Sequence, residues 1–368
     1  MMVTIVAGAR PNFMKIAPII RSIRMARKKG VDIGYRLVHT GQHYDQVMSQ
    51  AFFEELNIPE PDVNLGAGSG TQAEQTAAIM VAFERDLIRH PSDLVMVVGD
   101  VTSTLACSIV AKKLNTKVAH VEAGIRSGDL KMPEEINRMV TDSISDYFFT
   151  TSHWAGDNLR RNGVTDDRIF FVGNVMIDTL HANRARFQKP LIWDEAGLKE
   201  KHYLVMTLHR PSNVDREEKF RSFLEAIMDA SRDLPVIFPV HPRTRKIINH
   251  LNNGSRFGNH QLKLIDPLGY LQFNYLVERA KAVITDSGGI TEETTVMGIP
   301  CITLRDSTER PETVEVGTNE LIGTRPGDIK PAMEKLFAGQ WKAGSVPELW
   351  DGKTADRIVK HVMNLYGS

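Results

Sequence analysis

The sequence predicts an α/β protein with two Rossmann-like domains that face a central cleft, and three observations support this fold class. Short apolar segments rich in β-branched residues alternate with longer segments of helical period along the chain. The connections between them are short, as in doubly wound parallel sheets. The alternation stops once, at 187–199, where a proline and several charges replace the apolar pattern, and it then restarts.

The first predicted domain spans 1–186. Its segment at 94–98 is apolar at all five positions, which is typical of a strand in a sheet covered on both faces. The first helix is expected from about Asn12; Pro11 suits a first helical turn, whereas Pro18 predicts a kink or a delayed regular helix. We expect strands at 3–7, 35–39, 94–98, 117–121 and 147–150. We expect helices at 12–28, 46–56 and 72–88, a helix that follows residues 99–104 and ends at about 114, and a helix from 174 to 186.

The second predicted domain spans 187–353, and a C-terminal helix at 354–368 is expected to join the first domain. An apolar strand at 282–284 leads into a glycine turn and a helix that starts near Ile290. The other elements expected here are strands at 203–207, 236–240, 262–265 and 300–304, and helices at 217–231, 244–251 and 270–280.

The composition excludes several classes of protein. Lys plus Arg and Asp plus Glu both number 45, so the net charge is zero and a general nucleic-acid or anionic-membrane surface is not expected. Cys107 and Cys301 lie in apolar segments, which favours two core thiols over a disulfide, and their spacing gives no metal site. With neither a signal peptide nor an apolar segment of membrane-spanning length, we expect a cytoplasmic protein, and we expect no cofactor.

Polar residues follow most predicted strands of the first domain. Because ligands of parallel α/β sheets bind beyond the carboxyl ends of the strands, we expect Arg10, Gln42, His43, Asp100 and Glu122 to be neighbours at one edge. A further cation, Lys15, lies near the start of the first helix and with Arg10 suggests an anion site. The alternative is that both cations are simply solvated.

The second domain carries a glycine turn, Ser287-Gly288-Gly289, between a strand and a helix. This arrangement presents free backbone N–H groups and a positive helix end to an anion, and a side chain at either glycine would hold a phosphate away. The alternative is an ordinary strand–turn–helix corner. Glu292 and Glu293 are expected in the first helical turn, where carboxylates suit the dipole. Charged residues at 305–312 favour a ligand site at this edge.

These motifs together resemble those of the non-hydrolysing UDP-N-acetylglucosamine 2-epimerases, which have the glycosyltransferase-B fold. The resemblance covers both domains, in the family's order. It is carried by Gly8-Ala9-Arg10-Pro11 with Lys15, Gly99-Asp100, His120-Val121-Glu122-Ala123-Gly124, Pro133-Glu134-Glu135-Ile136-Asn137-Arg138, Gly173-Asn174, Leu208-His209-Arg210, Pro239-Val240-His241, residues 285–293 and residues 305–311.

The resemblance implies a role for each matching residue. UDP would lie on the second domain, with its diphosphate at the glycine turn, its ribose on Glu293 and its uracil near Phe273, although Phe273 also reads as a core aromatic. The UDP-binding residues implied are Arg10, Leu268, Phe273, Ser287, Gly288, Gly289, Glu293 and Arg310. The residues implied around the sugar are Lys15, Asp100, Glu122, Glu134 and His209. Read without the family, Asp100 is a helix N-cap and Glu134 a solvated first-turn carboxylate.

The chemistry implied by the resemblance is elimination of UDP to 2-acetamidoglucal and its re-addition with inversion at C2. This needs a base, an acid on the opposite face and cations for the leaving diphosphate. Crowded carboxylates can fill the acid and base roles, because crowding separates their pKa values. The resemblance also implies a homodimer, a UDP-sugar substrate and a place in polysaccharide biosynthesis, with no nucleic-acid or membrane partner.

Three departures from the common bacterial pattern bear on substrate and regulation. The segment at 125–132 is short, Val175 replaces a threonine, and Gly8-Ala9-Arg10-Pro11-Asn12 replaces the more usual Gly-Thr-Arg-Pro-Glu. The short form also resembles epimerases of UDP-2,3-diacetamido-2,3-dideoxyglucuronate. A hydrolysing epimerase, a glycosyltransferase and a non-catalytic UDP-sugar-binding regulator stay open as alternatives. Residues of a possible allosteric or additional substrate contact are Gln42, His43, Gln46, Arg210 and His241.

Overall fold

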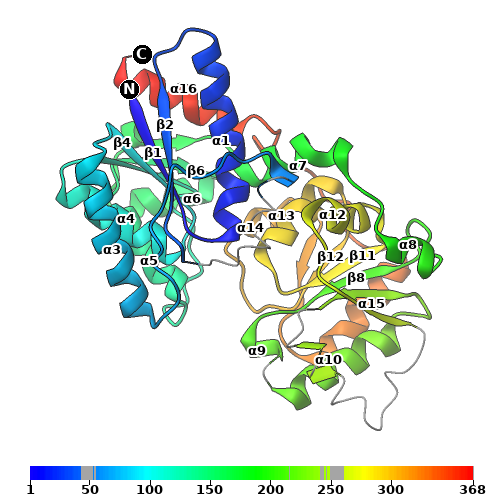
Figure 1. Cartoon of the computed structure of the whole chain (residues 1–368). Helices are drawn as coiled ribbons and strands as arrows, with labels where there is room; N and C mark the ends of the chain where they lie inside the picture. The colour runs from blue at the N-terminus through cyan, green and yellow to red at the C-terminus, as the bar shows by residue number, and fades with distance from the viewer. Residues whose placement is uncertain are drawn as a thin grey trace. The chain divides into compact units, whose positions relative to one another are not determined.

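A computed structural model describes residues 1–42, 53, 55–214, 216–240, 244–245, 247–248 and 261–367. The chain forms two compact units (Figure 1): unit 1 comprises residues 1–182 and 348–368, and unit 2 comprises residues 183–347. The boundary expected between 186 and 187 lies four residues from the one observed, and the C-terminal return to unit 1 begins at 348 rather than 354. None of the described helices is both long and apolar enough to cross a membrane.

Unit 1 is built on a seven-stranded sheet in the order β3-β2-β1-β4-β5-β6-β7, with every pair parallel. All five residues of β4 are buried, as its apolar sequence predicts. Because the strands are parallel, their carboxyl ends lie at one edge. The strands are β1 (Met2–Ala7), β2 (Gly34–His39), β3 (Val63–Asn64), β4 (Leu94–Val98), β5 (Lys117–Val121), β6 (Tyr147–Thr150) and β7 (Ile169–Phe171).

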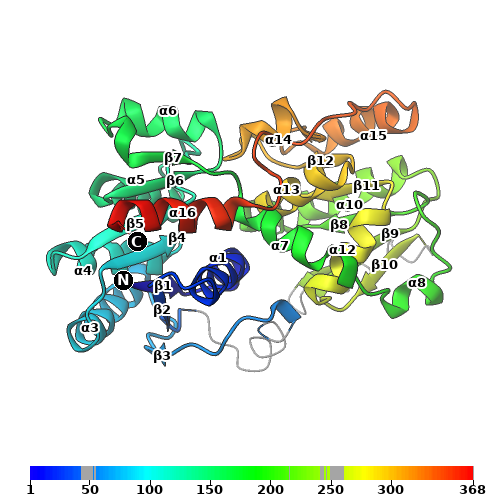
Figure 2. The ribbon, with the colours of Figure 1, turned by 90° about the horizontal axis from the view of Figure 1, so that it is seen from above.

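Helices connect these strands, and the C-terminal helix returns to pack on the first one (Figure 2). Asp178 accepts the backbone N–H groups of Thr354 and Ala355, which caps that C-terminal helix, and Ser22 donates to Asp356 at 2.7 Å. The helices are α1 (Arg10–Lys28), α3 (Gln72–Arg89), α4 (Thr102–Lys113), α5 (Pro133–Ile144), α6 (His153–Arg161), α7 (Val175–Asn183) and α16 (Thr354–Tyr366), with a 3₁₀ turn at Asp166–Arg168.

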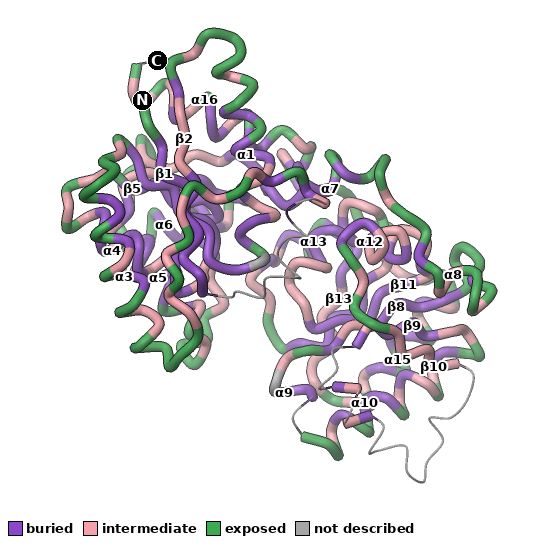
Figure 3. The backbone as a smooth tube through the Cα atoms, in the orientation of Figure 1, coloured by how far each residue is buried: buried purple, intermediate pink, exposed green. Residues whose placement is uncertain are grey.

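Unit 2 repeats this plan with a six-stranded parallel sheet in the order β10-β9-β8-β11-β12-β13. Its buried apolar residues lie on the strands and on the helix faces turned toward them (Figure 3). The strands are β8 (Leu204–Thr207), β9 (Val236–Pro239), β10 (Leu262–Ile265), β11 (Ala282–Thr285), β12 (Cys301–Thr303) and β13 (Asn319–Leu321). The helices are α8 (Leu191–Glu195), α9 (Pro211–Val214), α10 (Glu217–Ala230), α12 (Tyr270–Arg279), α13 (Gly288–Met297), α14 (Pro311–Glu315) and α15 (Ile329–Phe337).

The predicted alternation of parallel strands and helices is confirmed, and the differences have local causes. α13 begins at Gly288, two residues before the expected start, so Glu292 and Glu293 do not lie in its first turn. Pro18 is accommodated inside α1, which already begins at Arg10. Strands β3, β7 and β13 and helices α6, α8, α9, α14 and α15 were not predicted, and α5 was implied only by the reading of Glu134 as a first-turn carboxylate. Half of the expected helix at 244–251, and most of that at 46–56, lie outside the described residues, while residues 244–245 and 247–248 are described and helical.

Candidate functional site

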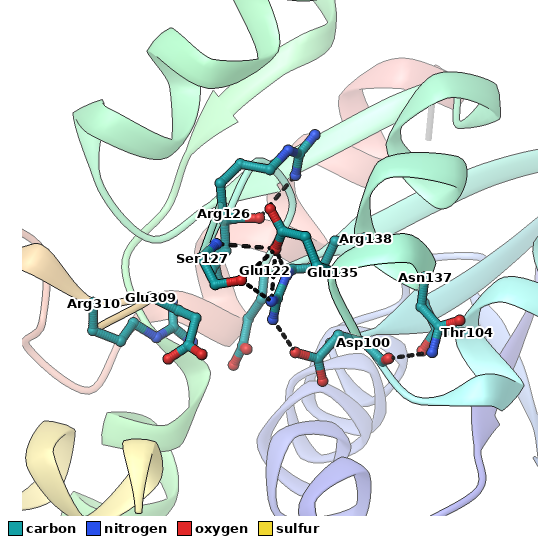
Figure 4. Close-up of polar contacts among 12 residues, drawn as sticks. Asp100, Thr104, Glu122, Arg126, Ser127, Glu135, Asn137, Arg138, Glu309 and Arg310 are labelled. Carbon is teal, nitrogen blue, oxygen red and sulfur yellow. Dashed lines mark hydrogen bonds and ion pairs between the residues drawn. The ribbon is translucent and has the colours of Figure 1, made fainter. Parts of the chain in front are cut away.

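Asp100 lies two residues after the end of β4 and forms an ion pair with an arginine. Its side chain is 34% exposed, and its Oδ2 pairs with Arg138 of α5, whose own side chain is buried (Figure 4). Val101, rather than Asp100, is the N-cap of α4, and it makes no side-chain capping bond. The reading of Asp100 as a helix N-cap is therefore wrong, because its carboxylate is used for a long-range ion pair.

Arg138 is in turn oriented by Glu135, which is almost fully buried (Figure 4). Glu135 Oε2 lies 2.9 Å from Arg138 Nε and 2.7 Å from Arg138 Nη2. Burial raises the pKa of Glu135, but hydrogen bonds from the backbone N–H groups of Ser127 and Gly128, together with Arg138, bring it below its ordinary value. Hydrogen bonds and ion pairs therefore connect the backbone of the 125–132 segment to Glu135, Glu135 to Arg138, and Arg138 to Asp100.

Glu122 follows β5, next to β4 in the sheet, and forms a second buried ion pair. Its Oε2 lies 2.7 Å from Lys15 Nζ of α1, and its backbone has a left-handed φ of +67°. Gly99 has a φ of +70°, and a Cβ at this position would lie 3.1 Å from Lys15 Nζ. Gly99 therefore provides both the turn before Asp100 and the space for the lysine.

The remaining candidate residues of unit 1 differ in their burial and in their hydrogen bonds. Gln42, at the end of β2, is buried, and its Oε1 accepts hydrogen bonds from Ser103 N and Oγ. Glu134 lies half-buried in the first turn of α5, and among the described residues it makes no polar side-chain contact, so its reading as a first-turn carboxylate fits its position. His43, Gln46 and the side chain of Arg10 lie outside the described part of the chain.

In unit 2, Asp286 organises the turn that carries His209. Asp286 follows β11, is fully buried, and accepts the backbone N–H groups of His209 and Arg210 and the side-chain amide of Asn213. His209 Nδ1 lies 2.8 Å from Asp286 Oδ1, while the imidazole side chain is 64% exposed. Burial raises the pKa of Asp286, but these hydrogen bonds and His209 lower it overall. His209 is thus anchored at one nitrogen and presented to solvent.

The N-terminus of α13 is open where an anion site was expected. Gly288 and Gly289 have no left-handed φ, and a Cβ at Gly289 would meet nothing within 4 Å. The fold itself therefore does not require glycine at 289. Ser287, the N-cap, makes no side-chain capping bond. The backbone N–H groups at this helix start are thus left for another acceptor.

The acidic pair of α13 is buried, contrary to the expected first-turn position. Arg310 Nε lies 2.6 Å from Glu292 Oε1, and Tyr270 Oη donates to Glu293 Oε1 at 2.8 Å. Burial raises the pKa of Glu293 to about 7. Because α13 starts earlier than predicted, neither carboxylate lies at the positive end of the helix dipole.

Arg305 is a candidate that the sequence analysis did not assign. Its Nη1 would lie 3.8 Å from a Cβ at Gly288, so this buried guanidinium stands beside the start of α13. Glu309 bonds Arg305 Nη2 at 2.6 Å and lies 3.8 Å from Arg210 Nη2. Two arginines thus share one carboxylate near the open helix end. The sequence analysis included Arg305 in the charged segment 305–312 that favours a ligand site, but gave it no role of its own.

The expected nucleoside residues lie on the same unit. Leu268 and Phe273 are partly buried and pack against the core group that includes Tyr203. Phe273 therefore keeps part of its ring surface accessible. His241 lies outside the described residues. Within the described ranges, no group of three or more His, Cys, Asp or Glu side chains is arranged to hold a metal ion.

Two units of this kind, each with a parallel sheet and functional residues after its strand ends, define a GT-B-like α/β protein. A family model described as UDP-N-acetylglucosamine 2-epimerase matches residues 25–363. The chain therefore belongs to the UDP-N-acetylglucosamine 2-epimerase family, which is a family of isomerases.

Relatives match almost the whole chain. The UDP-N-acetylglucosamine 2-epimerase of Methanocaldococcus jannaschii is 41% identical, with 98% of each chain covered. The crystal structure of the enzyme of that organism in complex with UDP-GlcNAc and UDP matches with a TM-score of 0.85 at 40% identity, covering 99% of this chain and 100% of the other. The UDP-2,3-diacetamido-2,3-dideoxy-D-glucuronate 2-epimerase of Pseudomonas aeruginosa is 38% identical, with 88% of each chain covered.

Proposed function

We propose that this protein interconverts UDP-N-acetylglucosamine and UDP-N-acetylmannosamine by inverting C2 of the sugar. The observation that carries the proposal is the pair of carboxylates at neighbouring strand ends of unit 1. Asp100 and Glu122 follow β4 and β5, and each is held by its own cation. Inversion at one carbon requires two positioned proton-transfer groups, and two fixed carboxylates can supply them.

The proposed reaction is an elimination followed by an addition, because no carbonyl group activates the C2 proton. One carboxylate takes this proton while the C1–O bond breaks, and UDP leaves with the bonding electrons to give 2-acetamidoglucal. UDP then adds back to C1 as the other group, in its acid form, protonates C2 from the opposite face. In the reverse direction the two groups exchange roles. Glu134 is assigned to the same sugar site, with Lys15 holding Glu122 in place.

Unit 2 is proposed to bind UDP. The N–H groups at the start of α13 would donate hydrogen bonds to the diphosphate oxygens, assisted by the charged side chains of His209 and Arg310. The open space at Gly289 and the exposed His209 support this assignment. Phe273, Leu268 and Glu293 would contact the nucleoside. Cations at the leaving diphosphate would stabilise the charge that develops as the C1–O bond breaks.

A second substrate is favoured by one comparison. The Pseudomonas aeruginosa relative that matches 88% of this chain acts, by its name, on UDP-2,3-diacetamido-2,3-dideoxy-D-glucuronate. This sugar differs at C3 and carries a carboxylate, but the proposed chemistry at C2 is the same. Purified protein assayed with both UDP-sugars separates the two candidates by their kcat/KM ratio.

The decisive experiment is solvent exchange at C2. Incubation with UDP-N-acetylglucosamine in deuterated water should place deuterium at C2 of both epimers, read by NMR or mass spectrometry. Asp100→Asn should abolish exchange and turnover while the Kd for UDP stays within about threefold of the wild-type value. Binding of UDP without any exchange by the wild type would instead identify a non-catalytic UDP-sugar-binding protein. Release of free N-acetylmannosamine with stoichiometric UDP would identify a hydrolysing epimerase.

We further propose a homodimer formed through unit 1. α4 packs between α3 and α5, and exposed apolar side chains lie on these outer helices and in the segment before α5. They are Val81, Ile88, Leu130, Ile136 and Met139. Sedimentation should give a dimer for the wild type, and Ile136→Glu combined with Ile88→Glu should give a folded monomer. A monomeric wild type would contradict this part of the proposal.

A further inference from the structure

His120 on β5 is a fully buried histidine with both ring nitrogens engaged. Its Nε2 lies 2.8 Å from the backbone oxygen of Gly99, and its Nδ1 lies 2.7 Å from Asp142 Oδ1 on α5. His120 therefore links the backbone of Gly99, the residue before Asp100, to Asp142 of α5 by one hydrogen bond at each ring nitrogen. Its side chain is 0% exposed, so water does not satisfy either nitrogen.

The two partners determine where the hydrogens are. A carbonyl oxygen can only accept, so Nε2 must donate to Gly99. Asp142 also accepts from the Gly124 backbone N–H at 3.1 Å and from Arg126 Nη1 at 2.6 Å. Because the Arg126 guanidinium is always charged and lies against Asp142 Oδ2 together with the Gly124 N–H, these contacts favour the ionised carboxylate. An ionised carboxylate can only accept as well, and Nδ1 must also donate.

We infer that His120 is a buried imidazolium, with both ring nitrogens donating, that positions the turn carrying Asp100. The neutral alternative would need a proton on Asp142, although Arg126 and the Gly124 N–H both favour its charged form. The charged groups that face the ring are Asp142 from α5 and Arg126 from the segment after β5. These three groups sum to one positive charge beside two strand ends that carry carboxylates.

The turn after β4 is held by side chains through three successive carbonyl oxygens. Val98 O accepts from Asn12 Nδ2 at 2.8 Å and from Thr104 Oγ1 at 3.0 Å. Gly99 O accepts from His120, and Asp100 O accepts from Asn137 Nδ2 at 2.8 Å. The other three donors are neutral, so His120 supplies the charge-assisted hydrogen bond of this set.

The predicted effect of His120 on catalysis rests on the proposed epimerase function, whereas the inferred charge of His120 does not. A general base must stay within a few tenths of an ångström of its working position, and a displacement of about 1 Å can lower a rate about 100-fold. His120 touches no substrate in this scheme, so it is a positioning residue for Asp100. Its loss should lower kcat with little change in UDP affinity, since UDP is assigned to unit 2.

The direct test is nitrogen NMR of the wild-type protein labelled with ¹⁵N-histidine. At pH 8 both ring nitrogens of His120 should show the shift of N–H-bearing nitrogens, with the signal assigned by its loss in His120→Gln. His39 is a buried control in the same unit, because its Nδ1 accepts from the Gly41 N–H at 2.7 Å and must be unprotonated. A neutral His120 at pH 8 would overturn the inference whatever the enzyme's activity.

The functional test compares His120→Gln and Asp142→Asn with His361→Gln, a control at a histidine of α16 whose ring packs at a tilt against Phe170. Both test variants should lose kcat about 100-fold, with the Kd for UDP within threefold, and His361→Gln should keep the wild-type kcat. Full kcat in a folded His120→Gln, checked by circular dichroism, would remove the positioning role. If the wild type shows no epimerase activity, the NMR result still decides the charge state, so the two proposals fail separately.

Discussion

Lys15 Nζ of α1 lies 2.7 Å from Glu122 Oε2 at the end of β5, and both groups are largely withdrawn from water. The two residues are 107 positions apart in the sequence, and the adjacent Gly99 leaves the space that the lysine fills. This pair joins the first helix of unit 1 to one of the two carboxylates proposed to act at C2. It therefore affects stability and activity together.

Lys15→Met removes the cation paired with Glu122 and should lower both stability and activity. Removing one member of a buried ion pair destabilises a protein by about 3 kcal/mol, and we expect a loss of that size in the free energy of urea unfolding. kcat should fall at least about 100-fold, because the Glu122 carboxylate would lose the cation that holds it in position. The double variant Lys15→Met with Glu122→Gln should regain most of the stability but none of the activity. Equal activity in the single variant and the wild type would contradict the assigned role.

Gly99→Ala tests the space beside Lys15 separately from backbone strain. A left-handed residue other than glycine costs about 1–2 kcal/mol, and here the new Cβ would also lie 3.1 Å from Lys15 Nζ. Gly163→Ala is the matched control, because Gly163 has a φ of +84° with nothing within 4 Å of its Cβ position. Both variants should lose similar stability in thermal unfolding, but only Gly99→Ala should lose activity. A fully active Gly99→Ala would show that the lysine can shift without consequence.

The strand ends show how far a sequence alone can locate a site. Asp100 and Glu122 follow apolar strands, and parallel strands share one carboxyl edge, so their neighbourhood could be predicted without knowing the fold in detail. Short edge strands such as β7 were not predicted, because all three of its residues are only half-buried and its pattern is too brief to stand out.

The partners of these carboxylates could not be predicted. Arg138 pairs with Asp100 across 38 residues of sequence, and the packing of α5 against α4 and β5 selects it rather than another arginine. Glu293 was expected in the first turn of its helix, but α13 starts two residues earlier, and the Glu293 carboxylate accepts a hydrogen bond from Tyr270. Such pairings depend on the exact residue at which each helix begins and on how the helix packs in the folded unit. Neither can be predicted from a single sequence.

Gly289→Ala tests the proposed phosphate site at the start of α13. The position has open space and no left-handed φ, so alanine should raise the free energy of unfolding by about 0.5–1 kcal/mol. The same methyl group would occupy the volume proposed for a phosphate oxygen, and we expect the Kd for UDP from calorimetry to rise at least about tenfold. Gly327→Ala is the control, since Gly327 also has open space in unit 2. Unchanged UDP affinity in Gly289→Ala would place the diphosphate elsewhere.

Glu312 of α14 is buried, and among the described residues neither of its carboxylate oxygens has a hydrogen-bond partner. Burial raises its pKa to about 7, with Glu292 and Glu315 acting in the same direction and Arg310 opposing them. Between about pH 4.5 and 7 the folded state therefore keeps a proton that the unfolded chain releases. The group stabilises the folded state at low pH, and this contribution disappears as the pH rises through 7.

Glu312→Gln should remove this pH dependence while keeping the shape of the side chain. The difference in unfolding free energy, variant minus wild type, should grow from pH 5 to pH 8 by up to about 3 kcal/mol, because about 2.5 pKa units at 1.36 kcal/mol each are involved. Urea unfolding at pH 5, 6, 7 and 8 measures this difference directly. Glu334→Gln, an exposed glutamate of α15 in the same unit, should show a constant difference near zero. A constant difference for Glu312→Gln as well would mean that Glu312 is ionised throughout this range.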